Sequence, residues 1–296
     1  MDPTVRQARQ DDYDDVVAFA RAIWDERPET VDYIPDVFRE WVDSDGPAQR
    51  TVVAEAQGAA AGLCQAVLLT DHEAWLQGMR VDPAFRGEGF GLAMVEELFS
   101  WARDRDAVVA RNMVFSWNDA GLGQSVAVGF DPTTAFRFAH PEPREGRPEL
   151  PVTDDPAAAW SYWTGSEGRE QLSGLALALD RPWALSELTR ENLATLAETE
   201  RVFAVTDDGT SGMACRTGTT TDPTDDGTLA EYAVGTWADR GSAAALFDAI
   251  RADAAGLGVD GTRVLLPETP RHVAEAAAVR ADLADWPDFV LSADLT

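Results

Sequence analysis

A glycine-rich hexapeptide is the stretch of this chain best suited to chemistry. It reads Arg86-Gly87-Glu88-Gly89-Phe90-Gly91 and lies between a strand-like run, residues 74–81, and a helical pattern over residues 91–103. Alternating glycines let bare backbone approach a ligand closely and adopt positive φ angles. Backbone N–H groups at the start of a helix bind anions, and Arg86 adds positive charge. The sequence therefore predicts a loop that holds the pyrophosphate of a coenzyme.

The residues present exclude two other phosphate-binding motifs. A Walker loop needs a Lys, and all 24 basic residues of this chain are Arg. A dinucleotide fingerprint that begins at Gly87 would need a glycine at position 92, where Leu92 stands. A glycine-rich turn can also be an ordinary connection between a strand and a helix, so the hexapeptide alone leaves its function open.

Other residues that could do chemistry are few. Three His and the two cysteines, Cys64 and Cys215, are scattered along the chain, so we expect no metal site. Both cysteines lie in apolar, strand-like surroundings, which favours buried thiols over a disulfide. Glu73 directly precedes the strand at 74–81 and is a candidate general base, with His72 beside it. Nothing in their spacing separates either residue from an ordinary turn residue.

The charge balance excludes several classes of partner. Fifty-two acidic residues against 24 basic ones give a net charge of −28. Nucleic acids and anionic membranes need a basic footprint, so neither is expected as a partner. Because the acids are spread along the whole chain, we interpret them as the surface of a soluble protein from a salt-loaded, halophilic cytoplasm. At molar salt the Debye length is only about 3 Å, and self-repulsion is screened.

The N-terminal sequence, Met1-Asp-Pro-Thr4, lacks the basic and apolar regions of a signal peptide. No run approaches the roughly 18 apolar residues of a membrane-spanning helix. These features favour a cytoplasmic location.

Strand and helix patterns alternate along the first half of the chain, which favours a mixed α/β sheet. The predicted strands are 5–8, 51–56, 62–69, 74–81, 107–115 and 135–139; the predicted helices are 16–23, 33–42, 91–103 and 119–127. A proline-rich, charged stretch follows at 141–156. We place a domain boundary there and expect an N-terminal domain over 1–148 and a linker with a helix over 149–181.

The second half repeats this order of elements. Its predicted strands are 183–188, 201–205, 212–216, 229–237, 262–266 and 289–291; its predicted helices are 191–198, 242–255 and 270–283. A duplication is the economical explanation, with the second domain over 182–296. The predicted fold class is therefore α/β, with two tandem mixed-sheet domains.

Two motifs resemble the GCN5-related N-acetyltransferase (GNAT) superfamily over roughly residues 4–140. The family signature is Gln or Arg, two residues, Gly, one residue, then Gly or Ala, which Arg86 to Gly91 match after the strand end Met79-Arg80-Val81-Asp82-Pro83. A second element is an Asn followed eleven residues later by Gly-Phe, matched by Asn118 and Gly129-Phe130. The second half resembles the family only in element order, so we expect two GNAT-like domains.

The resemblance implies acetyl-CoA as donor and direct transfer to an amine. It implies that the strand before the loop splays from its neighbour and that the thioester lies in the gap. Backbone groups of Met79 and Val81 would hold the pantetheine arm and the thioester carbonyl. The loop and Asn118 would complete the coenzyme site; the loop residues implied are Arg86, Gly87, Glu88, Gly89, Phe90 and Gly91. The carboxylate of Glu88 would have to point to solvent, away from phosphate.

The family's usual acid for the leaving thiolate is a Tyr seven residues after the Asn. Ser125 stands there in this chain, and a Ser hydroxyl is a far poorer acid than a phenol. No Tyr occurs between Tyr33 and Tyr162, so another group, or water, would have to take over the role. Ser125 can equally be an ordinary helix residue.

The loop at the corresponding place in the second half, Ala238 to Ala243, keeps one glycine and has Asp239 where an anion would bind. We expect this copy to be degenerate and to hold no pyrophosphate. The tandem layout resembles vertebrate histidine N-acetyltransferase relatives, which implies a small amine or an amino acid as acceptor. A non-catalytic acyl-CoA-binding regulator is the alternative, and a scaffold with degenerate loops is a third reading. The sequence does not indicate the oligomeric state.

Overall fold

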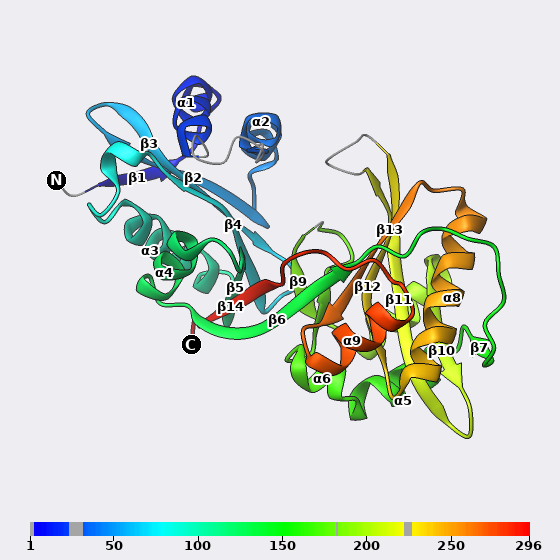
Figure 1. The fold of residues 1–296 in the computed structure, drawn as a ribbon. Coiled ribbons are helices and arrows are strands. Elements are labelled where there is room, and N and C mark those ends of the chain that lie inside the picture. The colour runs from blue at the N-terminus through cyan, green and yellow to red at the C-terminus, as the bar shows by residue number, and fades with distance from the viewer. Residues whose placement is uncertain (1–2, 24–31, 182, 222–226) are drawn as a thin grey trace. The chain divides into compact units, whose positions relative to one another are not determined.

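A computed structural model describes residues 3–23, 32–181, 183–221 and 227–296 (Figure 1). The chain divides into two compact units. The first unit comprises residues 1–114, 118–132 and 291–296, and the second comprises 115–117 and 133–290. This division differs from the bounds expected from the sequence. Residues 133–181 pack within the second unit, and residues 291–296 pack within the first.

The sheet of the first unit follows the predicted order of strands. Its neighbours run β1-β2-β3-β4-β5. The bounds are β1 Thr4–Gln7, β2 Gln49–Ala56, β3 Ala59–Leu68, β4 Glu73–Val81 and β5 Val109–Phe115. Pairing is antiparallel from β1 to β4 and parallel between β4 and β5. The strand β14 (Asp288–Asp294) is the neighbour of β5 in the sheet, and its residues from Leu291 onward belong to this unit.

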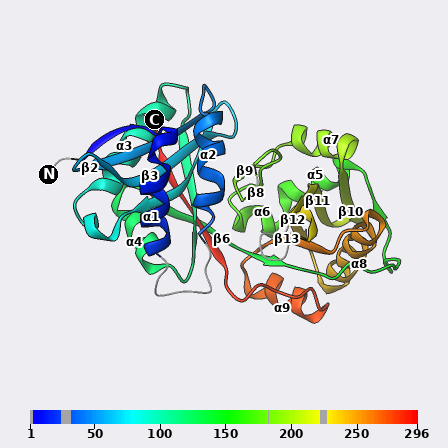
Figure 2. The same ribbon diagram turned by 90° about the horizontal axis from the view of Figure 1, so that it is seen from above.

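Helices cover both faces of this sheet (Figures 1 and 2). On one face lie α1 (Tyr13–Ile23) and α2 (Ile34–Ser44), and on the other lie α3 (Phe90–Arg103) and α4 (Asp119–Ala127). Short 3-10 turns, Gln10–Asp12 and Pro83–Phe85, precede α1 and α3. The face under α1 and α2 is apolar because Leu63 of β3 and Val53 of β2 pack there with Ile34 and Phe38, all of them fully buried. Each of these side chains contributes about 1.5–3 kcal/mol by leaving water.

The sheet of the second unit has the neighbour order β6-β13-β12-β11-β10-β7. The bounds are β6 Asp131–Ala139, β7 Val152–Thr153, β10 Arg201–Thr206, β11 Thr210–Thr221, β12 Thr228–Trp237 and β13 Gly261–Pro267. The pair β12–β13 is parallel, and the other neighbours pair in antiparallel fashion. A separate ribbon joins β8 (Leu175–Leu177) to β9 (Leu185–Glu187).

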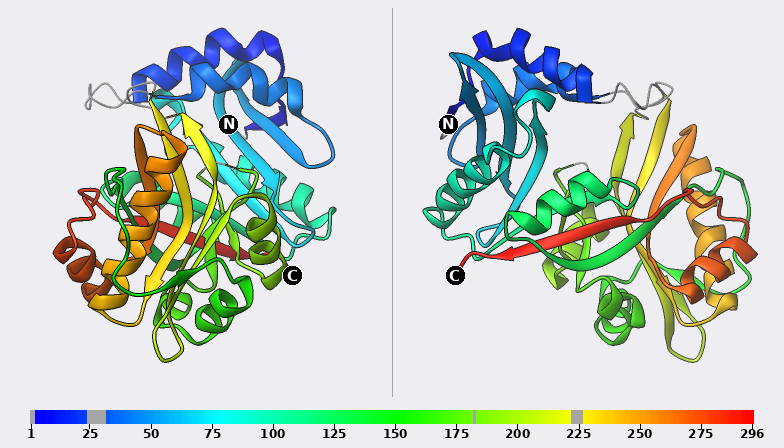
Figure 3. Two further views of the ribbon diagram at one scale, coloured as in Figure 1. Left: turned by 90° about the vertical axis from the view of Figure 1, so that its right-hand side faces the viewer. Right: turned by 60° about the vertical axis from the view of Figure 1, so that its left-hand side comes forward.

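The helices of the second unit also lie on both faces of its sheet (Figure 3). Their bounds are α5 Pro156–Gly165, α6 Glu167–Gln171, α7 Arg190–Thr199, α8 Arg240–Leu257 and α9 Pro270–Ala278. Leu246, Phe247 and Ile250 of α8 pack on Phe203 and Tyr232 of the sheet, and all are buried. α5 and α7 contact β10 and β11 from the other side. Residues 149–181, expected to form a linker with a helix, thus include α5, which packs against the sheet of the second unit.

Both units share one plan, which confirms the predicted α/β class with two tandem mixed sheets. In each unit, antiparallel strands lead to one parallel pair, β4–β5 or β12–β13, whose strands are joined by a helix, α3 or α8. Among the described residues, no helix is long and apolar enough to cross a membrane. Within the same residues, no group of three or more His, Cys, Asp or Glu could hold a metal ion.

Candidate active site

Strand β4 carries a β-bulge at Gly78 and Met79. On β3, Leu63 pairs with Arg80 and Gln65 pairs with Gln77, so Cys64 alone lies opposite two residues of β4. Gly78 has a φ of +67°, a conformation that a side chain rarely adopts. A Cβ at Gly78 would lie 2.6 Å from the ring of Trp41 on α2. The bulge changes the pairing of β4 at Gly78 and Met79, and the carbonyl of Met79 accepts from the guanidinium of Arg80 at 3.0 Å.

Just before the bulge, β4 loses its pairing with β5. In the described part of the chain the parallel ladder runs from Glu73–Val109 to Trp75–Arg111 and then stops. Both strands continue, to Val81 and Phe115. Backbone pairing between these strands is therefore absent beyond Trp75 and Arg111, and we call this stretch the opening between β4 and β5; the family resemblance implies such a divergence. Val81 remains paired, with Gly62 of β3, so β4 diverges from one neighbour only.

The loop after β4 presents backbone N–H groups. Asp82 caps the short turn before the loop through a bond from Ala84 N to its Oδ1 (2.8 Å). Gly87 and Gly89 have φ of +78° and +87°, and a Cβ on either would meet nothing within 4 Å. The N–H groups of Gly87, Gly89, Phe90 and Gly91 have no acceptor within the described structure. They fit the anion site predicted from the glycines.

Neighbouring side chains fix the start of α3. Phe90 is buried and packs on Phe85, with ring centroids 5.4 Å apart. The amide of Gln124 from α4 lies directly over Gly91, where a Cβ would collide with its Nε2, so a side chain there would displace Gln124. Arg86 and Glu88 are exposed, and Arg86 makes no ion pair with any described residue. The loop thus combines free N–H donors, a free cation and an anchored helix start.

Asn118 and Ser125 are both placed by α4. Asn118 is the N-cap, and its Oδ1 accepts from Gly121 N at 3.0 Å. Ser125 is buried, and its Oγ accepts from Nδ2 of Asn112 on β5 at 3.0 Å. Oδ1 of Asn112 is buried without a donor among the described residues. Phe130, the second residue of the Gly-Phe pair, is buried and contacts Phe99 edge-on.

Glu73 lies at the other end of β4 from the loop. Its carboxylate forms an ion pair with Arg111 of β5 and accepts from Thr70 Oγ1 at 3.2 Å. The carboxylate is 9% exposed and the guanidinium 15%. The pair lies where β4 and β5 are still joined, so it secures the closed end of the parallel pair. His72, its neighbour, is exposed.

Three further residues at this site, Gly78, Gln77 and Asn112, were not singled out by the sequence. A signal existed for Gly78, because an isolated glycine within a strand pattern often marks a bulge. Gln77 and Asn112 gave none, since a polar side chain midway along a strand is normally read as its solvent face.

The second unit has two positions that correspond to the helix start and the diverging strand of the first. In the second unit its own side chains occupy both. Asp239 caps α8: its Oδ1 accepts from Ser242 N at 2.8 Å and from Ser242 Oγ at 3.1 Å. These bonds, that from the backbone above all, lower the pKa of the Asp239 carboxyl. The chain's own carboxylate therefore occupies the helix N-terminus.

Where β12 continues past its last pairing with β13, side chains close the space. Thr236 of β12 lies 3.2 Å from Nε2 of His272, whose Nδ1 lies 2.8 Å from Oγ1 of Thr269. Burial lowers the pKa of His272 to about 4, so the ring is neutral near pH 7. Gly168 of α6 lies directly against Thr236.

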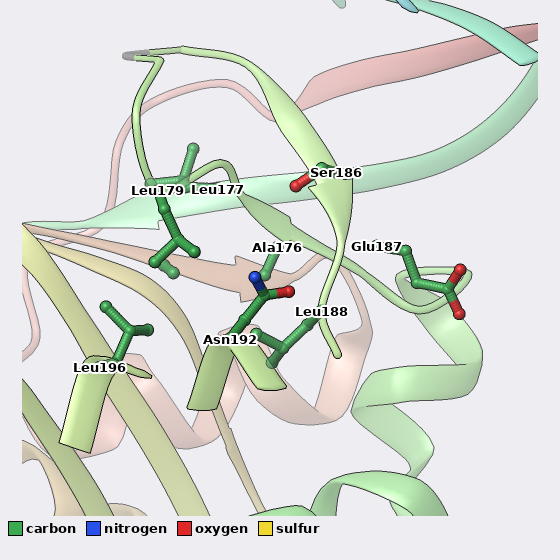
Figure 4. A pocket seen from close by; sticks show the side chains of 9 residues that line it. Ala176, Leu177, Leu179, Ser186, Glu187, Leu188, Asn192 and Leu196 are labelled. Atoms are coloured by element: carbon green, nitrogen blue, oxygen red, sulfur yellow. The ribbon is translucent and has the colours of Figure 1, made fainter. Parts of the chain in front are cut away.

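A small cavity within the second unit is lined mainly by aliphatic side chains (Figure 4). Leu177, Leu188, Asn192 and Leu196 are among its walls. Its volume of about 10 Å³ suffices for roughly one water molecule. It is too small for a coenzyme or an organic substrate.

Residues 7–121 match the model of the Acetyltransferase (GNAT) family. The comparison with curated proteins gave no match. Among solved structures, a GCN5-related N-acetyltransferase from Sphaerobacter thermophilus is 17% identical, with a TM-score of 0.60 over 99% of this chain and 96% of that one. A candidate acetyltransferase from Thermoplasma acidophilum is 16% identical, with a TM-score of 0.56 over 98% of this chain and 99% of that one. The chain therefore has the GNAT acetyltransferase fold along its length, and residues 7–121 carry that family's sequence pattern.

Proposed function

We propose that the protein is an N-acetyltransferase that moves acetyl from acetyl-CoA to the primary amine of a small molecule or an amino acid. The observation that carries this proposal is the set of N–H groups without an acceptor among the described residues, those of Gly87, Gly89, Phe90 and Gly91, which follow the strand whose pairing with β5 ends. Such a site fits a ligand with a pyrophosphate at one end and a reactive group at the other.

The loop residues would hold the pyrophosphate. Gly87, Gly89, Phe90 and Gly91 would donate from the backbone, and the positive end of α3 would favour the anion. Arg86 would add charge from the rim. The exposed carboxylate of Glu88 is free to turn to solvent. Asn118, at the start of α4, would line the coenzyme from the other side.

The bulge would hold the acyl end. Acetyl-CoA supplies a thioester whose carbonyl carbon an amine attacks directly, so no nucleophilic side chain is needed. The backbone N–H of Met79, a residue of the bulge, would polarise the carbonyl, and the backbone at Val81 would align the pantetheine arm. Fixed N–H donors of this kind need no reorganisation during the reaction.

Proton transfer has fewer candidates. Ser125 accepts a hydrogen bond from Asn112, which leaves its own proton available to a leaving thiolate. Glu73 was the candidate base, and its ion pair with Arg111 favours a structural role. We therefore propose Ser125 as the proton donor and expect water to take the proton from the ammonium group.

Titration calorimetry with acetyl-CoA tests the coenzyme site. The double variant Arg86→Glu with Gly89→Asp places carboxylates in the loop and should weaken binding at least about a hundredfold, because charge-assisted bonds are lost and repulsion is added. Arg240→Glu, at the start of α8, is the matched control and should bind as the parent does. Binding that survives the double variant would refute the assigned site.

A non-catalytic acyl-CoA-binding regulator is the second candidate. The observation that favours it is Ser125, since a Ser hydroxyl is a poor acid. Release of free thiol from acetyl-CoA with a panel of polyamines, free amino acids and short peptides separates the two. Binding without any amine-dependent thiol release would support the regulator.

A further inference from the structure

A chain of side-chain hydrogen bonds crosses β4, β3 and β2 on the face covered by α1 and α2. Gln77 Nε2 donates to Gln65 Oε1 at 2.7 Å, and Gln65 Nε2 donates to Thr51 Oγ1 at 2.9 Å. Thr51 Oγ1 donates to Asp45 Oδ1 at 2.9 Å. Gln65 and Thr51 are fully buried, in a region that is otherwise apolar. Buried polar groups cost free energy unless they are bonded, and these are bonded in series.

The carboxylate of Asp45 determines which group donates and which accepts in each of these side-chain hydrogen bonds. An ionised carboxylate can only accept, and Asp45 also accepts from Thr51 N at 3.0 Å. The Thr51 hydroxyl must then donate to Asp45 and accept from Gln65. Gln65 in turn must present its oxygen to Gln77. The orientation of both carboxamides, which is otherwise ambiguous, therefore follows from one carboxylate.

The free end of the chain lies at the opening in the sheet. Gln77 immediately precedes the bulge and lies two residues beyond Trp75, the last residue of β4 that pairs with β5. Its nitrogen donates to Gln65 on β3, which leaves its oxygen for another donor. Oε1 of Gln77 has no donor among the residues described, and the side chain is partly exposed.

We propose that Gln77 Oε1 accepts an N–H hydrogen bond from the acceptor amine, held in that orientation by Gln65, Thr51 and Asp45. This inference rests on the proposed function, because it places the amine at the opening between β4 and β5. A primary amine that attacks through its lone pair keeps N–H groups to donate. The coenzyme loop belongs to α3 on the opposite face, so the amine reaches the opening from the face of α1 and α2.

Two coenzyme A derivatives test the proposal without knowledge of the natural amine. In one, the sulfur carries CH2–C(O)–NH–propyl, and in the other it carries CH2–C(O)–O–propyl. The amide has an N–H where the attacking nitrogen would be, and the ester has none. One hydrogen bond of about 1 kcal/mol corresponds to about fivefold in Kd. Calorimetry should show the amide binding at least about fivefold more tightly to the parent protein.

Variants of the hydrogen-bonded chain should change this preference and leave the affinity for coenzyme A itself unchanged. Gln77→Leu should abolish it. Asp45→Asn should also reduce it, because the amide nitrogen of Asn can donate to Thr51, reverse the chain and turn the nitrogen of Gln77 outward. Gln7→Leu is the matched control: Gln7 also donates to Asp45, at 3.1 Å, from outside the chain, and its loss should leave the preference intact.

The outcomes separate the inference from the proposed function. An amide preference that persists in Gln77→Leu, with coenzyme A still bound, would overturn the role of Gln77 alone. Failure of the parent protein to bind coenzyme A would overturn the proposed function, and the inference with it. Unfolding measured in urea shows whether each variant is folded, so a loss of preference in a folded variant supports the proposal.

Discussion

At the scale of single residues, Gly78 meets two constraints at once. Its backbone lies in the left-handed region, and the ring of Trp41 occupies the space of a side chain. Both follow from the bulge, which lets two residues of β4 face Cys64 alone. The same bulge includes Met79, whose backbone N–H we propose as the donor to the thioester carbonyl. The position is therefore needed for packing and for the proposed polarisation of the thioester.

Replacement of Gly78 should show how much its left-handed backbone and its contact with Trp41 each contribute to stability. Gly78→Ala should lower the free energy of unfolding by about 2–5 kcal/mol, from the positive φ and from overpacking against Trp41. Gly58→Ala is the control, because its φ is +88° and nothing lies within 4 Å of its Cβ position, so it should lose only about 1–2 kcal/mol. Urea denaturation measures both. Equal losses would show that contact with Trp41 adds nothing.

The ion pair of Glu73 supports a second prediction. Glu73→Ala should lower the free energy of unfolding by about 3 kcal/mol, because it leaves the guanidinium of Arg111 largely buried and unpaired. Replacement of both partners by apolar residues should recover part of this loss. The ion pair lies where β4 and β5 are still paired, which favours a structural role for Glu73. The pH profile of acetyl transfer should therefore stay unchanged in folded Glu73→Ala. If the rate of acetyl transfer by the variant no longer rose with pH, Glu73 would be the general base after all.

The sequence predicted local features of the site and missed those that depend on distant partners. The positive φ angles of Gly87 and Gly89 in the loop were predictable because they follow from consecutive residues, and the anion-binding role of Arg86 to Gly91 stays a prediction. The direction of Gln77 depends on Gln65 and Thr51, which meet it only once β2, β3 and β4 have paired. Glu73 was read as a turn residue or a base because Arg111, its partner, lies 38 positions further on.

At the scale of elements, the starts of α3 and α8 form a natural comparison. Both helices follow a strand of a parallel pair, yet Gly89 at the N-cap of α3 offers no side chain, and Asp239 caps α8. The N–H groups at the start of α3 can bind an anion from outside the protein. Those at the start of α8 already bind the carboxylate of Asp239. The difference between the proposed anion site and a structural cap is here one side chain.

Removal of that cap should have a pH-dependent effect on stability. Asp239→Ala should lower the free energy of unfolding by about 1 kcal/mol at pH 7. The pKa of Asp239 is lowered in the folded protein, so its contribution is full above the unfolded value of about 3.9 and disappears as pH falls through the folded value. Urea denaturation of parent and variant at pH 7 and below pH 3 measures this. Asp239→Asn, which keeps a capping oxygen, should lose little at pH 7.

The elements themselves were largely predictable, because their hydrophobic periodicity is local. The division of the chain was not. The sequence predicts a linker with a helix over residues 149–181, and Pro156 begins α5 at a position where proline is favoured. Trp163 of that helix is fully buried, which makes it part of a core.

At the scale of the whole molecule, charge should control stability. With a net charge of −28, self-repulsion opposes folding in dilute salt and is screened at molar salt. We expect the Tm to rise substantially from about 0.05 M to 2 M KCl. Calorimetry at both concentrations checks this, with sucrose as a control for solvent exclusion without screening. An unchanged Tm would contradict the interpretation of the acidic surface.

The assignment of residues 291–296 to the first unit bears on how the protein is made. A ribosome synthesises residue 132 well before residue 291, and at 5–20 residues per second the delay is about 10–30 s. During that time β5 lacks the chain end whose Leu295 N donates to Val108 O at 3.0 Å. An unpaired strand edge can pair with other chains. The first unit, which carries the proposed coenzyme site, therefore receives residues 291–296 only after residues 133–290 have been synthesised, and the edge of β5 can pair with other chains until then.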